Sequence, residues 1–565
     1  MEKSFLKIID STSPFFERHP DMKINWSKIP FHHIEKNGRI RKKNRKKIRK
    51  NFSGYLDSVV KAGYNAISLD ELPYLVEYPF YPVYLKEKTA HYRKYFAKLV
   101  AEAVSKGLSV FITGDVTFSN EYIEEYSGSD HGKKVALFRD ALISLFISLP
   151  EVSGVILRIG ESDGIDVKGD FLSHLLLKTP RQGNAFLRRI LPVCEEFGKT
   201  CIFRTWTVGA YGIGDLIWNR RTYRQLFKGI ESPNLIVSMK YGDSDFFRYL
   251  KLNRHIMEAP QRKIVEFQTR REYEGFGEFP VFIGWEYQRY MRKLSKLRRI
   301  EGISVWCSTG GWSNFRNFTY LRKSSRWNEL NTYAASELMD GKKPKEIIRA
   351  FFKQPDKPYA EYLKLADTAV NTILYDPAFA RNELFFNRSR IPPLLHVFWN
   401  TITVNEFVIT FYRSFADSGE SCAALQRGKR ALKRMKQLNK QHDLDSRFGF
   451  FYDTFVILYY VRKLMYVHDR RDLKAKIEKK VSKYGKKYPD AYTFSISCND
   501  RSSHNSMLRF FMKLVVRRKA RYRYRDYLLF NGLTSRLYYA LYVLYKKSFP
   551  AFTGKQAMPI KTLLR

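Results

Sequence analysis

Three carboxylates stand just past the ends of separate apolar runs in this sequence. Glu161 follows GVILRIG, Asp245 follows NLIVSMKYGDS, and Glu272 follows KIVEFQTRR. If these runs are neighbouring parallel strands, the three side chains converge at one pocket mouth, because the carboxyl ends of parallel strands meet at the same edge. Paired carboxylates supply the acid and the base that cleavage of a glycosidic bond requires. The placement therefore predicts a site that hydrolyses a sugar linkage.

The elements that must position these acids are short apolar runs. Such runs, nearly continuous in apolar residues, are typical of strands buried on both faces of a parallel sheet. Amphipathic stretches with helical spacing lie between most of them. Eight strands alternating with helices predict a (β/α)8 TIM barrel over residues 1–345, with a doubly wound open sheet as the competing architecture. The predicted strands are residues 22–26, 66–70, 109–115, 154–161, 200–206, 234–240, 263–269 and 302–308.

The pattern changes after about Lys345. Segments such as AEYLKLADTAVNTILYD and CAALQRGKRALKRMKQLNK have helical spacing, and strand-like runs become rare. We therefore predict an all-helical C-terminal domain over residues 346–565.

Composition narrows the class of protein. The chain has 565 residues, of which 44% are hydrophobic, so it can bury a large core and is not globally disordered. Its five scattered cysteines form neither a disulfide framework nor a CxxC pair, and its histidines have no metal-ligand spacing. We expect no metal and no other cofactor. The N-terminus lacks the apolar core of a signal peptide, which favours a soluble, cytoplasmic protein.

The net charge of +44 calls for an explanation. Its densest source is Arg39–Lys50, where nine of twelve residues are cationic, and we interpret this segment as a basic insertion in the barrel. Such a run predicts docking to nucleic acid, to an anionic membrane surface or to an anionic polysaccharide. A solvated helix face is the structural alternative.

Other side chains near the strand ends suit a sugar site. Arg158, Arg204 and Lys240 are cations that can hold an anionic substrate group and lower the pKa of neighbouring carboxylates. Trp312 offers a ring on which a sugar can stack, and Asp163 is a further acid close to the fourth strand. A structural alternative stays open, in which carboxylates cap helices and Arg204 and Lys240 pair with the same acids.

These motifs together resemble a known family. The series RIGES, RTW, SMKYGDSDF, EFQTRREYEG and STGGW, in that order, is similar to family 67 of the glycoside hydrolases, the α-glucuronidases, over roughly residues 20–350. The resemblance implies an inverting exo-acting hydrolase with Glu161 as the general acid and Asp245 and Glu272 as the general base pair. In inverting enzymes the acid and base lie about 6.5–9.5 Å apart.

The resemblance also implies how the substrate is held. Arg204 and Lys240 match cations that grip the carboxylate of a uronic acid, and Trp312 matches an aromatic residue of the pocket. Three departures are evident. The fourth-strand loop would also allow Asp163 as the acid, the family's sandwich domain before the barrel is expected to be missing, and the family is rarely this basic. The substrate therefore stays open between a xylan-derived glucuronosyl oligosaccharide and another uronic-acid-containing glycan.

Two further hypotheses belong to other classes. One is a catalytically inactive carbohydrate-binding protein of glycan assembly. The other is a polyanion-binding protein that recognises nucleic acid through its basic segments. The oligomeric state also stays open, a homo-oligomer included.

Overall fold

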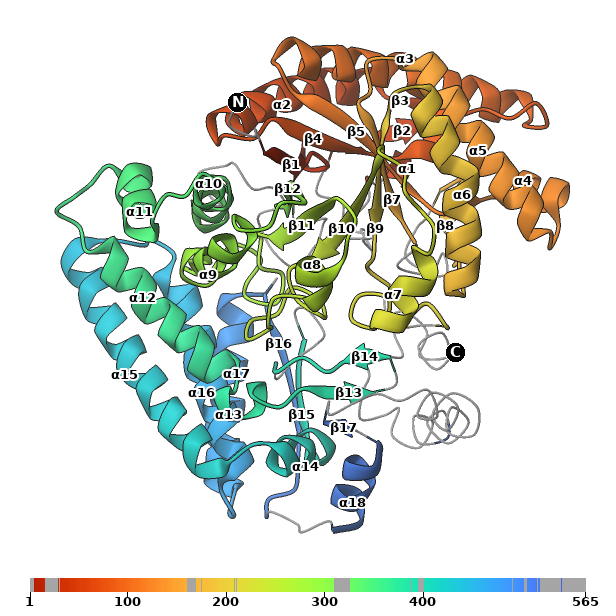
Figure 1. Cartoon of the computed structure of the whole chain (residues 1–565). Coiled ribbons are helices and arrows are strands. Elements are labelled where there is room, and N and C mark those ends of the chain that lie inside the picture. Colours follow the sequence, from red (N-terminus) through yellow and green to blue (C-terminus); the bar gives the residue numbers. More distant parts are fainter. Residues whose placement is uncertain are drawn as a thin grey trace.

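Eight parallel strands close into a barrel (Figure 1). The structure, a computed structural model, describes residues 5–15, 29, 31–159, 169–173, 175–207, 209, 211–308, 326–386, 388–394, 401–489, 491–501, 506–515, 517–518 and 540. The strand order around the barrel is β1-β12-β11-β10-β9-β7-β5-β4, which confirms the predicted (β/α)8 fold and excludes an open sheet. The strands are β1 (Leu6–Asp10), β4 (Ala66–Asp70), β5 (Ser109–Asp115), β7 (Gly154–Arg158), β9 (Thr200–Arg204), β10 (Leu235–Lys240), β11 (Lys263–Gln268) and β12 (Ile300–Trp306).

The first strand is not the one that we predicted. Residues 22–26 lie outside the described residues, and the barrel is closed instead by Leu6–Asp10, which pairs in parallel with both β12 and β4. Both segments are short runs of mixed apolar and polar residues, so the local pattern does not separate them. The choice is made by long-range pairing, in which Leu6 lies opposite Gly302 of the last strand.

Helices cover the outside of the barrel and run between its strands. They include α2 (Lys42–Lys61), α3 (Val83–Ser105), α5 (His131–Ser148), α6 (Pro180–Glu196), α7 (Arg220–Leu226), α8 (Arg254–Glu258), α9 (Gly284–Leu294) and α10 (Arg326–Met339). The basic segment Arg39–Lys50 lies largely within α2, and its interpretation as an insertion stays a prediction. Its helix buries Asn44, Ile48 and Phe52 at intervals of four residues, which turns the lysines and arginines between them outward.

Inside the barrel, the side chains nearer the amino ends of the strands are apolar, and those nearer the carboxyl ends are polar. One layer consists of Ile8, Ala66, Phe111, Ile156, Ile202, Ile236 and Ile264. Because side chains on a strand alternate between faces, the residue two positions further also points inward. On all seven strands that residue is polar and lies nearer the carboxyl end, and on four of them it is charged: Asp10, Arg158, Arg204 and Glu266.

The C-terminal region is mostly helical, as predicted. Its longer helices are α11 (Pro344–Phe352), α12 (Tyr359–Ala369), α14 (Glu406–Phe415), α15 (Ser418–His442), α16 (Phe448–Tyr466), α17 (Arg471–Lys487) and α18 (Ser506–Val515). It also contains strands, a finding that we did not predict. β13 (Leu384–Phe386) and β14 (Ser389–Arg390) form a sheet with β17 (Arg517–Arg518), and β15 (Thr401–Asn405) pairs with β16 (Thr493–Ser497). The boundary at residue 345 stays a prediction.

Within the described residues, no helix combines the length and the apolar character needed to cross a membrane. The cytoplasmic location stays a prediction.

Candidate active site

Two of the three predicted catalytic carboxylates meet at one tyrosine. The Tyr273 hydroxyl donates to Asp245 Oδ2 at 2.7 Å, and its pKa is raised by burial and further by the nearby charges of Asp245 and Glu272. Asp245 follows β10 and Glu272 follows β11, and these strands are neighbours in the barrel. The structure therefore brings Asp245 and Glu272 together, as their positions at strand ends predicted.

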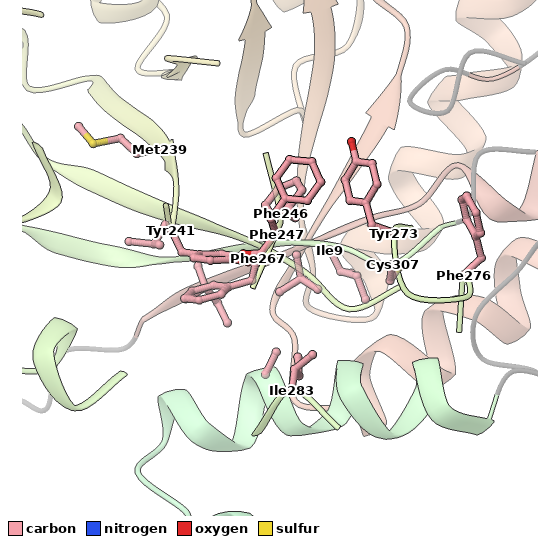
Figure 2. Close-up of a cluster of buried hydrophobic side chains, with 14 of the residues drawn as sticks. Ile9, Met239, Tyr241, Phe246, Phe247, Phe267, Tyr273, Phe276, Ile283 and Cys307 are labelled. Carbon is pink, nitrogen blue, oxygen red and sulfur yellow. Dashed lines mark hydrogen bonds between the residues drawn. The ribbon is translucent and has the colours of Figure 1, made fainter. Parts of the chain in front are cut away.

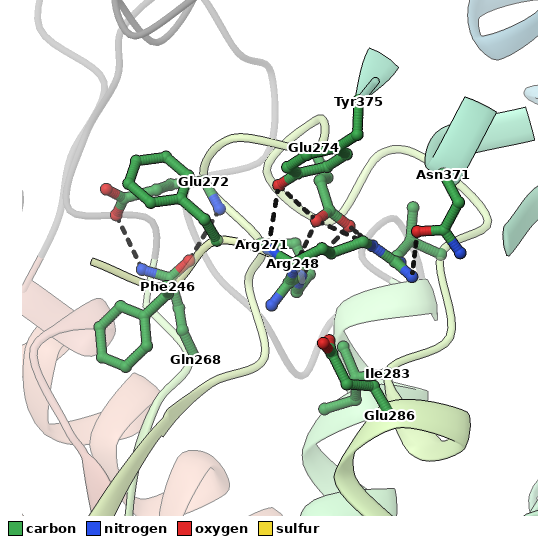
Figure 3. A network of polar contacts seen from close by, with 12 residues as sticks. Phe246, Arg248, Gln268, Arg271, Glu272, Glu274, Ile283, Glu286, Asn371 and Tyr375 are labelled. Carbon is green, nitrogen blue, oxygen red and sulfur yellow. Dashed lines mark hydrogen bonds and ion pairs between the residues drawn. The ribbon is translucent and has the colours of Figure 1, made fainter. Parts of the chain in front are cut away.

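Glu272 is held in place by its own loop. Its Oε2 accepts hydrogen bonds from Gln268 Nε2 at 2.8 Å and from the Arg270 guanidinium at 2.6 Å. The backbone N–H of Glu272 donates in return to Gln268 Oε1 at 2.9 Å (Figure 3). Arg270 also donates to the carbonyl oxygen of Ser308, which ties this loop to the end of β12. The carboxylate is thus fixed in direction before any substrate arrives.

Asp245 is paired with the predicted cation Lys240. The Lys240 ammonium lies 2.6 Å from Asp245 Oδ1, which also accepts the backbone N–H of Phe246 at 2.9 Å. Burial alone would raise the pKa of Asp245, but the charge of Lys240 and the hydrogen bonds from Lys240 and Tyr273 outweigh it and lower that pKa. The Lys240 ammonium also lies 3.4 Å from the ring centroid of Trp206. Asp245 is therefore ionised at neutral pH.

Aromatic packing supports this side of the site. The rings of Phe247 and Tyr273 contact each other with centroids 4.3 Å apart, within the buried cluster drawn in Figure 2. Phe246 lies on the other side of Lys240, with its ring centroid 4.5 Å from the ammonium. Since the rings occupy the space around Tyr273 and Lys240, neither side chain has much freedom to leave its carboxylate.

Arg204 is bound by a carboxylate that the sequence did not reveal. Its guanidinium donates to both oxygens of Glu266, at 3.0 and 2.8 Å. Glu266 also accepts from Ser238 Oγ at 2.8 Å and from Trp306 Nε1 at 3.1 Å. Burial opposes ionisation of Glu266, but Arg204 and the further donors outweigh burial and lower its pKa. We missed Glu266 because it lies inside the run KIVEFQ, although a single charge in an apolar run was itself a signal.

Arg158 is likewise surrounded by acids. Its guanidinium lies 2.7 Å from Asp115, 3.1 Å from Glu71 and 3.8 Å from Asp70, and all four side chains are buried. These acids end or follow β4 and β5, and we did not single them out. Arg158, predicted to bind substrate, thus holds three carboxylates at the barrel mouth.

Three predicted site residues lie outside the described residues: Glu161, Asp163 and Trp312. Glu161 and Asp163 follow β7 directly, three and five residues after Arg158 in the sequence. Their roles stay predictions.

Trp206 and Trp306 offer partly exposed rings at the mouth. Trp206 follows β9 and rests on Lys240, and Trp306 ends β12 with its ring centroid 4.5 Å from the guanidinium carbon of Arg204. Each indole covers a buried cation, while part of its surface stays accessible.

The C-terminal region contributes to the wall beside this site. Arg390 of β14 pairs with Asp243 at 3.2 Å, two residues before Asp245. The Trp218 indole N–H donates to the carbonyl oxygen of Arg388 at 2.8 Å. Nothing in the local sequence could identify these contacts, since they join residues more than a hundred positions apart.

A second polar network fixes the loop after β11 to the C-terminal helices (Figure 3). Glu274 accepts from Arg248 Nε at 3.0 Å, from Arg271 and from the Tyr375 hydroxyl at 2.9 Å. Arg248 also pairs with Asp367 of α12. Because Glu274 lies two residues after Glu272, this network also fixes the loop that contains Glu272.

Within the part of the chain that the structure describes, no group of three or more His, Cys, Asp or Glu side chains is placed to hold a metal ion.

Comparison with known proteins finds solved structures with a similar fold but no match in sequence. No family model matches this chain, and no curated protein matches it in sequence. Among solved structures, the chain is similar to a GH138 enzyme targeting pectin rhamnogalacturonan II, with a TM-score of 0.55 and 12% identity. The match covers 90% of this chain and 66% of that protein, so the chain spans just under two thirds of its length.

Two other solved structures match at lower similarity. They are CpGH84B, with a TM-score of 0.36 and 11% identity over 77% of this chain and 68% of that one, and a D-allulose 3-epimerase from Methylomonas sp., with a TM-score of 0.32 and 10% identity over 60% and 99%. The likeness to the GH138 enzyme shows a distant glycoside hydrolase-like fold.

Proposed function

We propose that this protein is a glycoside hydrolase whose active site lies at the carboxyl end of the barrel. The observation that carries this proposal is the placement of Asp245 and Glu272 beside Tyr273, just past the neighbouring strands β10 and β11. The fold shared with a GH138 enzyme that targets pectin rhamnogalacturonan II supports it. The active site of a TIM barrel lies on this face in essentially every characterised enzyme of the fold.

The proposed reaction is an inverting hydrolysis like that of the family 67 α-glucuronidases. Glu161 donates its proton to the leaving oxygen, and the Asp245–Glu272 pair takes a proton from a water molecule, whose oxygen attacks the anomeric carbon. The bond to the leaving group breaks as the new C–O bond forms, and exchange with solvent then returns a proton to Glu161 and removes one from the Asp245–Glu272 pair. Asp245 suits the base side because it is ionised. Glu272 suits the same role because Gln268 and Arg270 hold its carboxylate in one orientation.

The proposed substrate is a uronic-acid-containing glycan. Its sugar rings would stack on Trp206 and Trp306, which are partly exposed at the mouth. A substrate carboxylate would have to share Arg204 or Lys240 with Glu266 or Asp245, because both cations are already paired. The mouth thus supports hydrolysis of a glycan more directly than recognition of a terminal uronic acid.

The test compares leaving groups. Glu161→Gln should lower turnover of oligosaccharides about 10²–10⁴-fold and largely spare aryl glycosides whose leaving group departs without a proton. Glu272→Gln should lower turnover of both substrates, because the water needs a base in either case. Glu231→Gln, an exposed acid in the loop that precedes β10, is the matched control and should change neither.

Equal losses on both substrates in Glu161→Gln would remove that residue as the acid. Carbohydrate binding without turnover by the unaltered protein, across neutral and uronic substrates, would favour the inactive carbohydrate-binding protein instead. NMR of the first anomer released tests the inverting outcome.

A further inference from the structure

Four aromatic side chains form an accessible platform on the loops that follow β4 and β5. We call this group the rim platform: Phe80, Tyr84, Tyr122 and Tyr126. Tyr84 is 51% exposed and Tyr126 is 53% exposed. The Phe80 and Tyr126 rings stack with centroids 4.5 Å apart, and the Tyr84 and Tyr122 hydroxyls lie 3.3 Å apart. Tyr122 and Tyr126 are one turn apart on α4 (Glu121–Ser127), so the four rings are contiguous.

The rim platform lies on the same face of the barrel as the candidate active site. The segment after β4 has Glu71 at the mouth, Phe80 in its loop and Tyr84 in the first turn of α3, and the segment after β5 has Tyr122 and Tyr126 on α4. Val83 extends the apolar surface and is 73% exposed. Contiguous exposed apolar patches are rare on soluble proteins and mark binding sites.

A strongly basic surface adjoins this platform. We call the nine cations between Arg39 and Lys50 the basic patch, and all nine are exposed. Arg39 lies 3.4 Å from Glu87 of α3, which is one turn from Tyr84, so the two surfaces are continuous. Glu102 lies 3.8 Å from Arg49.

The local fold does not account for the placement of these cations. The first turn of α2 contains no acidic residue, and no side chain caps its N-terminus. Lysines at that end face the positive pole of the helix dipole, which is unfavourable. The helix would form more readily with acids there, so the cations at this end do not help to form α2.

We propose that the rim platform and the basic patch together bind an extended acidic polysaccharide, whose chain passes over this rim of the barrel. Faces of the pyranose rings stack on Tyr84 and Tyr126, and their carboxylates pair with lysines and arginines of the basic patch. The choice of a glycan rests on the proposed function, because the surface borders the mouth of a proposed glycoside hydrolase.

Two other anionic partners fit the surface less well. A groove for single-stranded nucleic acid would interleave aromatic rings with cations along the strand, whereas here the rings gather at one end. Insertion into a membrane needs an exposed apolar helix face, but the apolar face of α2, with Ile48, Phe52 and Leu56, is buried against the barrel. Both partners are kept as outcomes of the test.

The experiment measures binding of the full chain to polygalacturonate and to its methyl-esterified form, which has the same backbone without the charge. Tyr84→Ala with Tyr126→Ala should weaken binding of both polymers about tenfold, while Tyr84→Phe with Tyr126→Phe should leave it nearly unchanged, because the ring faces remain. These exposed positions should tolerate all four changes, which circular dichroism checks.

A second, independent experiment removes positive charges from the basic patch. Replacing Lys42, Lys43, Lys46 and Lys50 by Gln should weaken binding of polygalacturonate at least about tenfold, flatten its salt dependence and spare the esterified polymer. The matched control removes four exposed cations of α15, Arg427, Lys429, Arg430 and Lys433, and should change nothing. It separates the basic patch from the overall charge of +44.

Three results would overturn the proposal. The first is that the Phe variants bind the polymers as weakly as the Ala variants, and the second is that the α15 control loses as much affinity as the α2 variant. The third is that the protein binds duplex DNA or phosphatidylglycerol vesicles more tightly than the polymers, without any effect of the Tyr changes. The assay requires no turnover. A protein that binds the polymer but cleaves nothing would therefore refute the proposed hydrolase and leave this surface standing.

Discussion

Replacing Arg204 by Met tests whether the cations of the candidate site are structural. The side chain of Arg204 is 4% exposed and that of Glu266 is 1% exposed, and two hydrogen bonds join them. Removing one partner of a buried ion pair leaves the other charge uncompensated, which costs about 3–5 kcal/mol in the free energy of unfolding. At roughly 2 °C per kcal/mol for a large domain, the melting temperature should fall by about 6–10 °C.

The loss of stability in Arg204→Met should depend on pH, and the ionisation of Glu266 determines the direction of that dependence. In the unaltered protein the pKa of Glu266 is lowered, so its pairing stabilises the fold above the unfolded pKa, and this contribution is lost as the pH falls through the lower folded pKa. In Arg204→Met, burial is no longer offset and the pKa of Glu266 rises instead. The protein can then avoid a buried charge by taking up a proton. The deficit should therefore be largest at pH 7–8 and smaller near pH 5.

Scanning calorimetry measures the melting temperature of Arg204→Met, and two further variants show whether the loss comes from the buried ion pair. Arg204→Met combined with Glu266→Gln should recover most of the stability, because the amide oxygen can accept from Trp306 Nε1 and the amide NH2 can donate to Ser238 Oγ without a charge. Arg220→Met breaks an exposed pair with Glu258 and should cost only about 0–1 kcal/mol. If Arg204→Met costs no more than Arg220→Met, or the double variant recovers nothing, the buried pair does not contribute as the structure indicates.

Two further predictions concern single groups. Tyr273→Phe removes the hydroxyl that donates to Asp245 beside Glu272, so it should cost about 1–3 kcal/mol in unfolding free energy and lower turnover without a comparable change in substrate binding, as steady-state kinetics would show. Unchanged turnover would exclude Tyr273 from positioning Asp245. Burial raises the pKa of Asp215 to about 6, above its unfolded value, so this group should contribute up to about 3 kcal/mol more stability as the pH falls from 8 to 4. The melting temperature of Asp215→Asn should therefore fall relative to that of the unaltered protein over this range, and a difference that does not change with pH would contradict the assignment.

Local sequence patterns were enough to predict most of the barrel. Buried parallel strands are continuous apolar runs, so the seven strands from β4 to β12 lie where the pattern indicated. The first strand could not be identified this way, because LKIID and MKINW have similar patterns and only the pairing of Leu6 with Gly302 distinguishes them. Asp245 and Glu272 could be identified because they stand just past strand ends, where the fold gathers side chains. Glu266 could not, because it sits within a strand and its partner Arg204 is on another.

The charges at the barrel mouth are arranged differently from those of the surface. In a chain of net charge +44, the described part of the mouth has more acids than cations. Its charged residues are seven carboxylates and four cations: Asp10, Asp70, Glu71, Asp115, Asp245, Glu266 and Glu272, with Arg158, Arg204, Lys240 and Arg270. Buried ion pairs add little net stability, so we infer that these pairs chiefly fix the orientation of the carboxylates.

An acidic polymer would then be attracted by the basic patch but repelled at the mouth, except where its carboxylate lies beside Lys240 or Arg204. Comparing the affinity of Arg204→Met for uronic and for neutral glycosides therefore tests whether the sugar at the cleaved bond is itself charged. This question is separate from how the basic patch binds the polymer. A larger loss of affinity for the uronic glycoside would place the substrate carboxylate beside Arg204, whereas equal losses on both would assign Arg204 to holding Glu266 alone.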